Sequence, residues 1–144
     1  MKIPVNNISF FGNEKKYIND CIDKSWVGSD GDYVELLEKG VASLVGRKYA
    51  VSCSNGSAAL DMAIHSSTLK EGDEVLMPNF TIISCAQYFI LRGIKPIFLD
   101  CDPRTFNIKT DDIRKKITKK TKAILVVHIY GLTVDMDPLM ELAN

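Results

Sequence analysis

The chain has 144 residues, the size of one ordinary domain that can bury a hydrophobic core. Its 18 basic residues balance 18 acidic ones, so no overall field attracts nucleic acid or an acidic membrane surface. The 4 cysteines lie far apart without a C-x-x-C pair, so the sequence predicts no metal site and reduced thiols. With no signal-like start and no apolar run near the ~18 residues of a membrane span, we expect a soluble, cytoplasmic protein.

Helical patterns fill the N-terminal part of the chain. Apolar residues that recur every three to four positions predict helices over residues 13–24 and 33–45, and Asn13 is suited to cap the first. The second helix should stop at Gly46, because glycine readily adopts the left-handed conformation that ends a helix. The loop between them is rich in turn residues, and its Trp26 is expected to be a packing anchor.

From residue 49 onward, short apolar runs alternate with helical patterns. The expected strands cover residues 49–53, 74–77, 96–100 and 123–128, and the expected helices cover 57–66, 83–91, 110–117 and 136–143. The runs at 75–77, 97–99 and 124–127 are continuously apolar, as is typical of strands buried on both faces. This alternation predicts an α/β fold with a mostly parallel sheet joined by right-handed crossovers.

The segment Ser54-Asn55-Gly56-Ser57 stands between an expected strand and an expected helix. The first N–H groups of a helix have no partner inside it, and together with the helix dipole they can bind a phosphate. Asn55 and Gly56 suit a tight turn with positive φ. Ser57 could cap the helix and offer its hydroxyl to a phosphate oxygen, although a capped turn without a ligand is the open alternative.

Further candidate residues follow the other expected strands, because ligands of such sheets bind beyond the carboxyl ends of the strands. They are residues 78–84, Asp100, Asp102, His128, Tyr130 and Gly131. Structural interpretations stay open: Asp100 could cap a loop and Asp102 before Pro103 is typical of a turn. His128 could equally be an ordinary histidine at a strand end.

Three common nucleotide and hydrolase motifs are missing from the sequence. It has no G-x-x-x-x-G-K-[ST] phosphate loop and no G-x-G-x-x-G after the first expected strand, which argues against a P-loop and a dinucleotide site. It also lacks the G-x-S-x-G elbow of hydrolases. A phosphate held by the single N-G-S helix start is the arrangement that remains.

Four segments in order resemble the DegT/DnrJ/EryC1/StrS family of pyridoxal-phosphate sugar aminotransferases, and the resemblance runs from about Asn13 to the end. They are 49–51 (Y-A-V) with 54–60 (S-N-G-S-A-A-L), 72–75 (G-D-E-V), 78–81 (P-N-F-T), and 127–131 (V-H-I-Y-G) with 135–137 (D-M-D). The resemblance implies the N-terminal part of the large domain of the aspartate-aminotransferase fold (PLP fold type I). Residues 1–32 would form an N-terminal helix and substrate-side loop, and residues 33–144 a partial cofactor-binding domain.

The resemblance implies pyridoxal 5'-phosphate as the cofactor, with Asn55, Gly56 and Ser57 around its phosphate. Many members have an aromatic residue that stacks on the cofactor ring at the position of Ile82, so contact here would be apolar packing. Phe80 is expected to pack inside the protein instead. The matching segment for the sugar substrate, often across a dimer interface, is Ser29-Asp30-Gly31, and His128 is a further substrate-side candidate.

The activity implied for the intact protein is transamination, from glutamate to a nucleotide-linked 4-keto-6-deoxy sugar, in surface-polysaccharide (O-antigen) amino-sugar biosynthesis. The intact protein would be a homodimer. The family's Schiff-base lysine and its pyridinium-pairing aspartate lie downstream of the last matching segment, so we expect no catalytic residue and no transamination in this chain. Because a partial sheet leaves edges and apolar faces uncovered, we expect this fragment by itself to be poorly soluble or to self-associate. A pyridoxal-phosphate sugar dehydratase of the same fold and a non-catalytic remnant domain are the alternatives.

Overall fold

A computed structural model describes residues 3, 4 and 6–143, and contacts group the chain up to Ser52 into one compact unit and the chain from Cys53 into another. In the first unit, Glu38 accepts hydrogen bonds from the N–H (2.8 Å) and the hydroxyl (3.0 Å) of Ser52, and these lower the pKa of the Glu38 carboxyl. Residues 32 and 33, between which the sequence predicted a boundary, both lie in the first unit, and the Glu38–Ser52 hydrogen bonds connect the last residue of that unit to it. The proposed division of roles at that boundary stays a prediction.

The first unit contains the two predicted helices, α1 (Glu14–Asp23) and α2 (Asp32–Leu44). The predicted cap at Asn13 is wrong for its side chain, which makes no capping hydrogen bond at the start of α1. The predicted stop at Gly46 is confirmed, since Gly46 has φ 63° and the Arg47 N–H donates to Ala42 O at 2.8 Å. This 6→1 hydrogen bond satisfies a carbonyl that the helix end would otherwise leave without a partner.

Trp26 packs as predicted, in an aromatic cluster of the first unit. Its ring meets Tyr33 edge-on at 6.3 Å between centroids, and Lys24 Nζ lies 4.6 Å from the centroid of the Trp26 ring. Lys24 also donates to Asp20 at 2.9 Å, which lowers the pKa of Asp20 and raises the pKa of Lys24. The cluster therefore joins the end of α1 to the start of α2.

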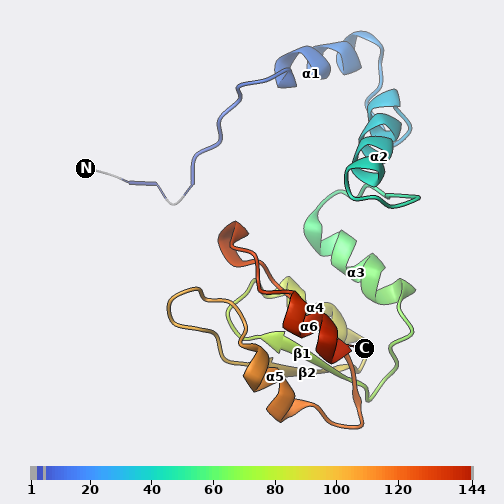
Figure 1. The fold of residues 1–144 in the computed structure, drawn as a ribbon. Helices are drawn as coiled ribbons and strands as arrows, with labels where there is room; N and C mark the ends of the chain where they lie inside the picture. Colours follow the sequence, from blue (N-terminus) through green and yellow to red (C-terminus); the bar gives the residue numbers. More distant parts are fainter. Residues whose placement is uncertain (1–2, 5, 144) are drawn as a thin grey trace. The chain divides into compact units, whose positions relative to one another are not determined.

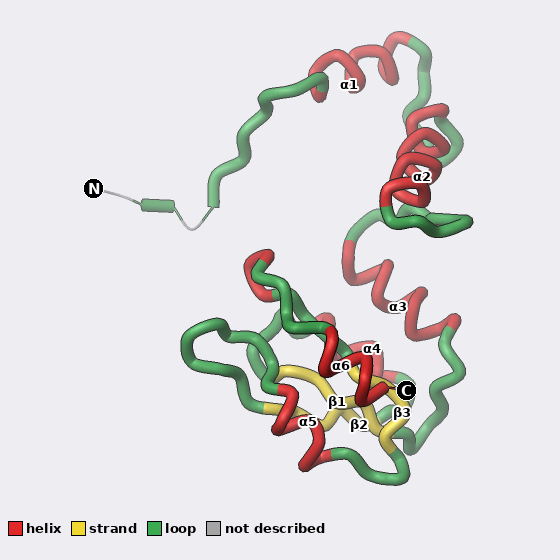
Figure 2. Tube along the Cα trace, viewed as in Figure 1, coloured by secondary structure: helices red, strands yellow, loops and turns green. Residues whose placement is uncertain are grey.

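The second unit is an α/β structure around a three-stranded parallel sheet, with strand order β2-β1-β3. Figure 1 shows α5 and α6 on one side of this sheet and α4 on the other, and Figure 2 shows the long loops that join them. The elements are α3 (Gly56–Ser66), β1 (Glu74–Pro78), α4 (Ser84–Leu91), β2 (Lys95–Leu99), α5 (Thr110–Lys116), β3 (Thr121–Ile124), a 3-10 turn (Ile129–Gly131) and α6 (Asp137–Ala143).

Strand β1 is buried along its whole length and supplies both cores of the sheet. Because side chains alternate along a strand, Leu76 faces one side while Val75 and Met77 face the other. Leu76 packs with Ile113 of α5 and Leu139 of α6. The residues opposite come from α3 and α4: Ile64 and Phe89 pack with Val75, and Leu60, Cys85 and Ala86 pack with Met77.

Three predicted strands differ from the structure. No strand is assigned to residues 49–53, so the first predicted strand is wrong; its Ser52 N–H bonds to the Glu38 carboxylate rather than to a strand ladder. β2 is not buried on both faces, since Leu99 is its only buried residue and Phe98 is 47% exposed. β3 starts and ends earlier than predicted, although Leu125 N still donates to Leu76 O at 2.8 Å.

Replacing Leu76 by alanine should lower the free energy of unfolding of the second unit by about 2–5 kcal/mol, because it leaves a cavity in a fully buried site. Urea unfolding followed by circular dichroism measures this loss. Leu91→Ala is the matched control, since Leu91 is 71% exposed at the end of α4 and should cost under about 0.5 kcal/mol. Equal losses in the two variants would contradict the assigned core.

Candidate functional site

The start of α3 is held by its own N-cap residue, Asn55. Asn55 Oδ1 accepts from the Ala58 N–H at 2.9 Å, while its Nδ2 donates to Ser54 Oγ at 3.3 Å. The Ala59 N–H donates to Asn55 O at 3.1 Å and begins the regular helix ladder. The N–H groups of Gly56 and Ser57 therefore remain as the ones without a partner inside the helix.

Two details of the predicted turn are wrong. The cap is Asn55 and not Ser57, which lies in the first turn of the helix. The turn also needs no positive φ, because Asn55 has the extended φ of −166°. An extended Ncap is the usual geometry, since it lets the side chain reach the N–H three residues later. The start of α3 is therefore a helix N-terminus capped by Asn55, and its role as an anion site stays a prediction.

The backbone at Gly56 faces open space. A Cβ built on Gly56 would meet no atom within 4 Å outside its own helix backbone, and Gly56 is exposed while Ser57 is half-buried. A small anion can thus approach the backbone at Gly56, next to which Ser57 stands in the chain. This geometry fits a phosphate group, which prefers several N–H donors at the positive end of a helix.

The phosphate-binding candidates Asn55, Gly56 and Ser57 are called the cradle below. One apolar cluster places them near the carboxyl ends of β1 and β3. Leu60 from the first turns of α3 packs against Met77, and Val127, next to His128, packs in the same cluster. Ile82 lies in the loop between β1 and α4 and is 68% exposed, so its side chain is available to an apolar ligand surface. The cluster therefore ties the start of α3, through Leu60, and the residue before His128, Val127, to β1, and Ile82 lies in the loop that follows β1.

Phe80 does not pack fully inside as predicted. It is 41% exposed and contacts two aromatic rings, with centroid distances of 5.1 Å to Phe106 and 6.5 Å to Tyr130. The three rings follow the carboxyl ends of β1, β2 and β3, which parallel pairing brings to one edge of the sheet.

Asp100 and Asp102 shape the loop after β2, and for both the structural interpretation is confirmed. Asp100 Oδ1 accepts from the Cys101 N–H at 3.0 Å and from Asn79 Nδ2 at 3.3 Å. Asp102 Oδ1 accepts from the N–H groups of Arg104 (2.8 Å) and Thr105 (3.1 Å). These donors, that of Arg104 first, lower the pKa of the Asp102 carboxyl.

His128 is exposed and held through one ring nitrogen. The Val134 N–H donates to His128 Nδ1 at 3.1 Å, across the 3-10 turn that contains Tyr130 and Gly131. Sequence reasoning missed Asn107, whose buried side chain bonds to this turn. Nothing local in the sequence marks Asn107, because its partners lie more than 20 residues further along the chain.

The candidates Ser29, Asp30 and Gly31 belong to the first unit, in the exposed loop between α1 and α2. Gly31 is the N-cap residue of α2, and a Cβ there would lie 3.3 Å from Trp26 Cβ. The glycine thus allows the loop to pack closely on Trp26. Nothing in the first unit tests a role of this loop toward a substrate, and that role stays a prediction.

Residues 11–144 match the model of the DegT/DnrJ/EryC1/StrS aminotransferase family. The chain belongs to this family. The chain is 42% identical over 142 residues to GDP-perosamine synthase of Escherichia coli O157:H7 and 39% identical over the same length to that of Vibrio cholerae. In both cases the match covers 99% of this chain and 39% of the relative, so the chain spans about two-fifths of the relatives' length.

Solved structures of sugar enzymes confirm the fold class. An E. coli GDP-4-keto-6-deoxy-D-mannose-3-dehydratase with bound hydrated PLP aligns with TM-score 0.87 and 29% identity, over 97% of this chain and 37% of that protein. An aminotransferase from Psychrobacter cryohalolentis aligns with TM-score 0.82 and 32% identity, over 94% and 34%. The chain therefore has the fold of the N-terminal part of the large domain of the pyridoxal-phosphate aminotransferases, with the parallel sheet that was predicted.

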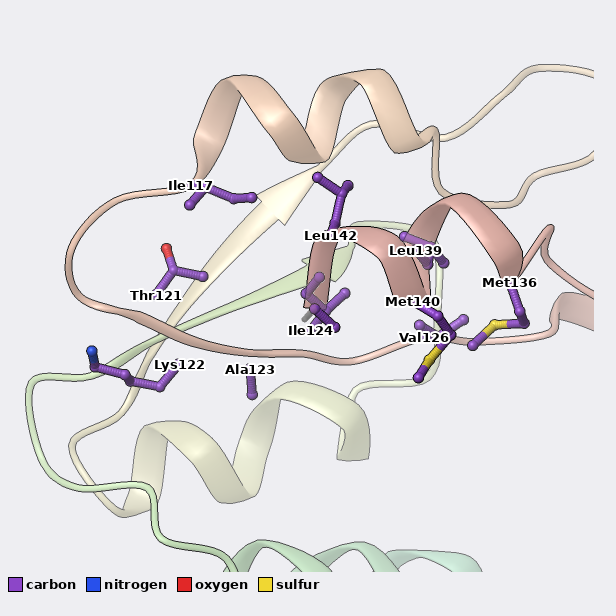
Figure 3. Close-up of a pocket in the computed structure, with 11 residues that line it drawn as sticks. Ile117, Thr121, Lys122, Ala123, Ile124, Val126, Met136, Leu139, Met140 and Leu142 are labelled. Atoms are coloured by element: carbon purple, nitrogen blue, oxygen red, sulfur yellow. The ribbon is translucent and has the colours of Figure 1, made fainter.

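A hollow of about 290 Å³ lies between β3 and α6 of this family member, and Figure 3 shows its lining. Its residues are largely apolar, and Asn55, Gly56 and Ser57 are not among them. β3 is an edge of the sheet, so this hollow borders the side on which no further strand is described.

Across the described residues, no helix is long and apolar enough to cross a membrane.

Asn55→Ala should destabilise α3 by about 1 kcal/mol, because the Ala58 N–H loses its acceptor. Hydrogen exchange at the Ala58 amide should accelerate roughly fivefold, the exchange equivalent of that energy. Asn55→Asp keeps an acceptor oxygen and should retain the protection. An unchanged Ala58 exchange rate in Asn55→Ala would show that the cap does not hold the helix start.

The turn at Asp102 should weaken in acid. Because the pKa of Asp102 is lowered on folding, its contribution to stability is complete above about pH 5 and is lost as pH falls below the usual value of 3.8 and through the lowered pKa. The amide resonances of Arg104 and Thr105 should follow this titration. In Asp102→Asn, whose amide oxygen still accepts but cannot be protonated, both amides should stop responding in that range.

Proposed function

We propose that the protein of which this chain is part is a pyridoxal-phosphate-dependent aminotransferase acting on a nucleotide-linked 4-keto-6-deoxy sugar. Glutamate would be the amino donor, and the product would be an amino sugar for surface polysaccharide such as O-antigen. The single observation that carries the proposal is the N-terminus of α3, where Gly56 borders open space and the N–H groups of Gly56 and Ser57 have no partner inside the helix. The relatives named GDP-perosamine synthase support the choice of a guanosine-diphosphate-linked sugar.

The chain's own residues would bind and orient the cofactor. The N–H groups of Gly56 and Ser57 and the Ser57 hydroxyl would donate to the phosphate. The Ala58 N–H is not needed for this, because it already donates to Asn55 Oδ1. Ile82 would pack its exposed side chain against the cofactor ring. When bound, the cofactor supplies the aldehyde group that carries the amino group from donor to acceptor. These residues give binding and orientation rather than rate.

Substrate-side roles are proposed for His128 and for the loop Ser29-Asp30-Gly31. His128 is exposed, and one ring nitrogen is already engaged by Val134, so the other is available to an oxygen of a ligand. In the intact protein, which we propose to be a cytoplasmic homodimer, the loop would approach the sugar.

A sugar dehydratase of the same fold is the second candidate. It is favoured by the similarity to the E. coli GDP-4-keto-6-deoxy-D-mannose-3-dehydratase, at TM-score 0.87. The residue at the position of the family's cofactor lysine separates the two candidates, since an aminotransferase has lysine there and the dehydratase has another residue. We propose that the 144-residue chain by itself does not transaminate, because none of its lysines occupies a matching context.

Titration of the ¹⁵N-labelled chain with pyridoxal 5'-phosphate should shift the amide resonances of Gly56 and Ser57. Inorganic phosphate should shift the same amides, and pyridoxal without phosphate should leave them unchanged. Ser57→Ala should weaken binding by about tenfold, because a hydrogen bond to a charged group is lost. Ser66→Ala, at the other end of the same helix, is the matched control and should bind as the parent does.

If binding shifts other amide resonances and leaves those of Gly56 and Ser57 unchanged, the proposed phosphate site and the function that depends on it would be wrong. For the chemistry, a polypeptide of the relatives' full length that contains this sequence should convert a GDP-linked 4-keto-6-deoxy sugar in the presence of glutamate. Consumption of glutamate with its nitrogen released as ammonia, together with a deoxygenated sugar that carries no new amino group, would favour the dehydratase instead.

A further inference from the structure

Asn107 is one of the few polar side chains buried in the described part of the protein, at 7% exposure. It stands at the end of a tight loop after β2, where Cys101 and Ile108 form an antiparallel bridge. Its Nδ2 donates to Leu132 O at 3.0 Å, and its Oδ1 accepts from the Ile129 N–H at 3.3 Å. Both ends of one amide therefore hold a second segment, 129–132.

The segment that Asn107 holds has an unfavourable backbone. Tyr130 has φ 51° and Gly131 has φ 84°, two consecutive left-handed residues. Glycine adopts this conformation freely, but an aromatic residue does so at a cost of about 1–3 kcal/mol and only where neighbouring groups fix it. The two hydrogen bonds to Asn107 lie on either side of Tyr130 and Gly131, so they fix the turn at both its ends.

The same turn sets the proton position on His128. The Val134 N–H donates to His128 Nδ1 at 3.1 Å, so Nδ1 is an acceptor and carries no proton. In the neutral imidazole the proton must then be on Nε2. The His128 side chain is exposed, and Nε2–H is left as a hydrogen-bond donor beyond the carboxyl end of β3.

We propose that Asn107 is a positioning residue: it fixes the turn 128–134 and thereby presents His128 as an oriented Nε2–H donor. Such a donor suits a hydroxyl, carbonyl or carboxylate oxygen of a ligand, and this use rests on the proposed function. The positioning itself does not, because it follows from contacts among Asn107, Ile129, Leu132 and the histidine turn.

The chemistry of the amide explains why asparagine is required. One carbonyl and one N–H of the turn need one donor and one acceptor, and an amide side chain offers both. Aspartate of the same shape could accept from Ile129 but could not donate to Leu132 O, and leucine could do neither. A buried backbone group that loses its partner costs about 1–3 kcal/mol, enough to release the strained turn.

Nitrogen NMR of the histidine rings tests the proposal directly. The chain has only 2 histidines, so the ¹⁵N-labelled protein gives two ring systems, and His65, which contacts Arg92, is the internal reference. In the parent protein His128 should show one tautomer, with a protonated Nε2 and an unprotonated Nδ1. A protonated Nδ1, or resonances averaged between the two tautomers, would overturn the proposal without any variant.

Two substitutions then test the role of Asn107. In Asn107→Asp the His128 ring resonances should move toward averaged values while those of His65 stay fixed. In Asn107→Leu the Ile129 amide should also exchange with solvent about tenfold faster, the rate equivalent of ~1.4 kcal/mol. Asn19→Asp, the same change on the exposed face of α1, is the matched control and should alter neither ring.

A folded Asn107→Asp protein with unchanged His128 resonances would refute the positioning role. This outcome is distinguishable from failure of the proposed function. Loss of the pyridoxal 5'-phosphate response at Gly56 and Ser57 would remove the function and leave the tautomer result untouched. A shifted tautomer in Asn107→Asp with the cradle response intact would support both.

Discussion

Parallel pairing of β1 on both of its edges is the constraint on which the second unit depends. β1 pairs with β2 and with β3, and its five residues are buried throughout. A strand in this position must be apolar on both faces, and helices must then cover both faces. Because the three strands run the same way, their carboxyl ends meet at one edge. The loop with Ile82, the Asp102 turn and His128 all follow from that arrangement.

The candidate site consists of neutral groups, and the Asp102 carboxylate nearby bonds within its own loop. The N–H groups of Gly56 and Ser57, the amide of Asn107 and the ring of His128 carry no formal charge in the arrangement described. The Asp102 carboxylate instead closes its own turn. Recognition of an anion here would rest on backbone dipoles, which a single side-chain substitution weakens but does not remove.

The sequence was sufficient for elements defined by local pattern. The apolar run at 75–77 predicted the buried central strand, and Gly46 predicted the end of α2. The strand predicted at 49–53 was wrong, because apolar residues favour an extended chain but do not determine whether a neighbouring strand pairs with it. The cap was assigned to Ser57 instead of Asn55 because both residue types suit an N-cap, and only the backbone geometry separates them.

Sequence reasoning missed the contacts between residues that lie far apart along the chain. Asn107 has no pattern of its own, since its importance comes from the carbonyl of Leu132 and the N–H of Ile129. His128 was recognised by its position after a strand, but its tautomer depends on Val134 and could be read only from the folded chain. Ring and amide orientation are tertiary properties.

The separation along the chain between Asn107 and its partners also bears on the order of folding. The cap from Asn55 to Ala58 closes across three residues and can form as soon as α3 does, within microseconds. The hydrogen bond from the Ile129 N–H to Asn107 Oδ1 joins residues 22 positions apart, so it can form only after β3 has paired with β1. The cap at the start of α3 can therefore form early, whereas the turn at residues 128–134 acquires its shape only after the sheet has assembled.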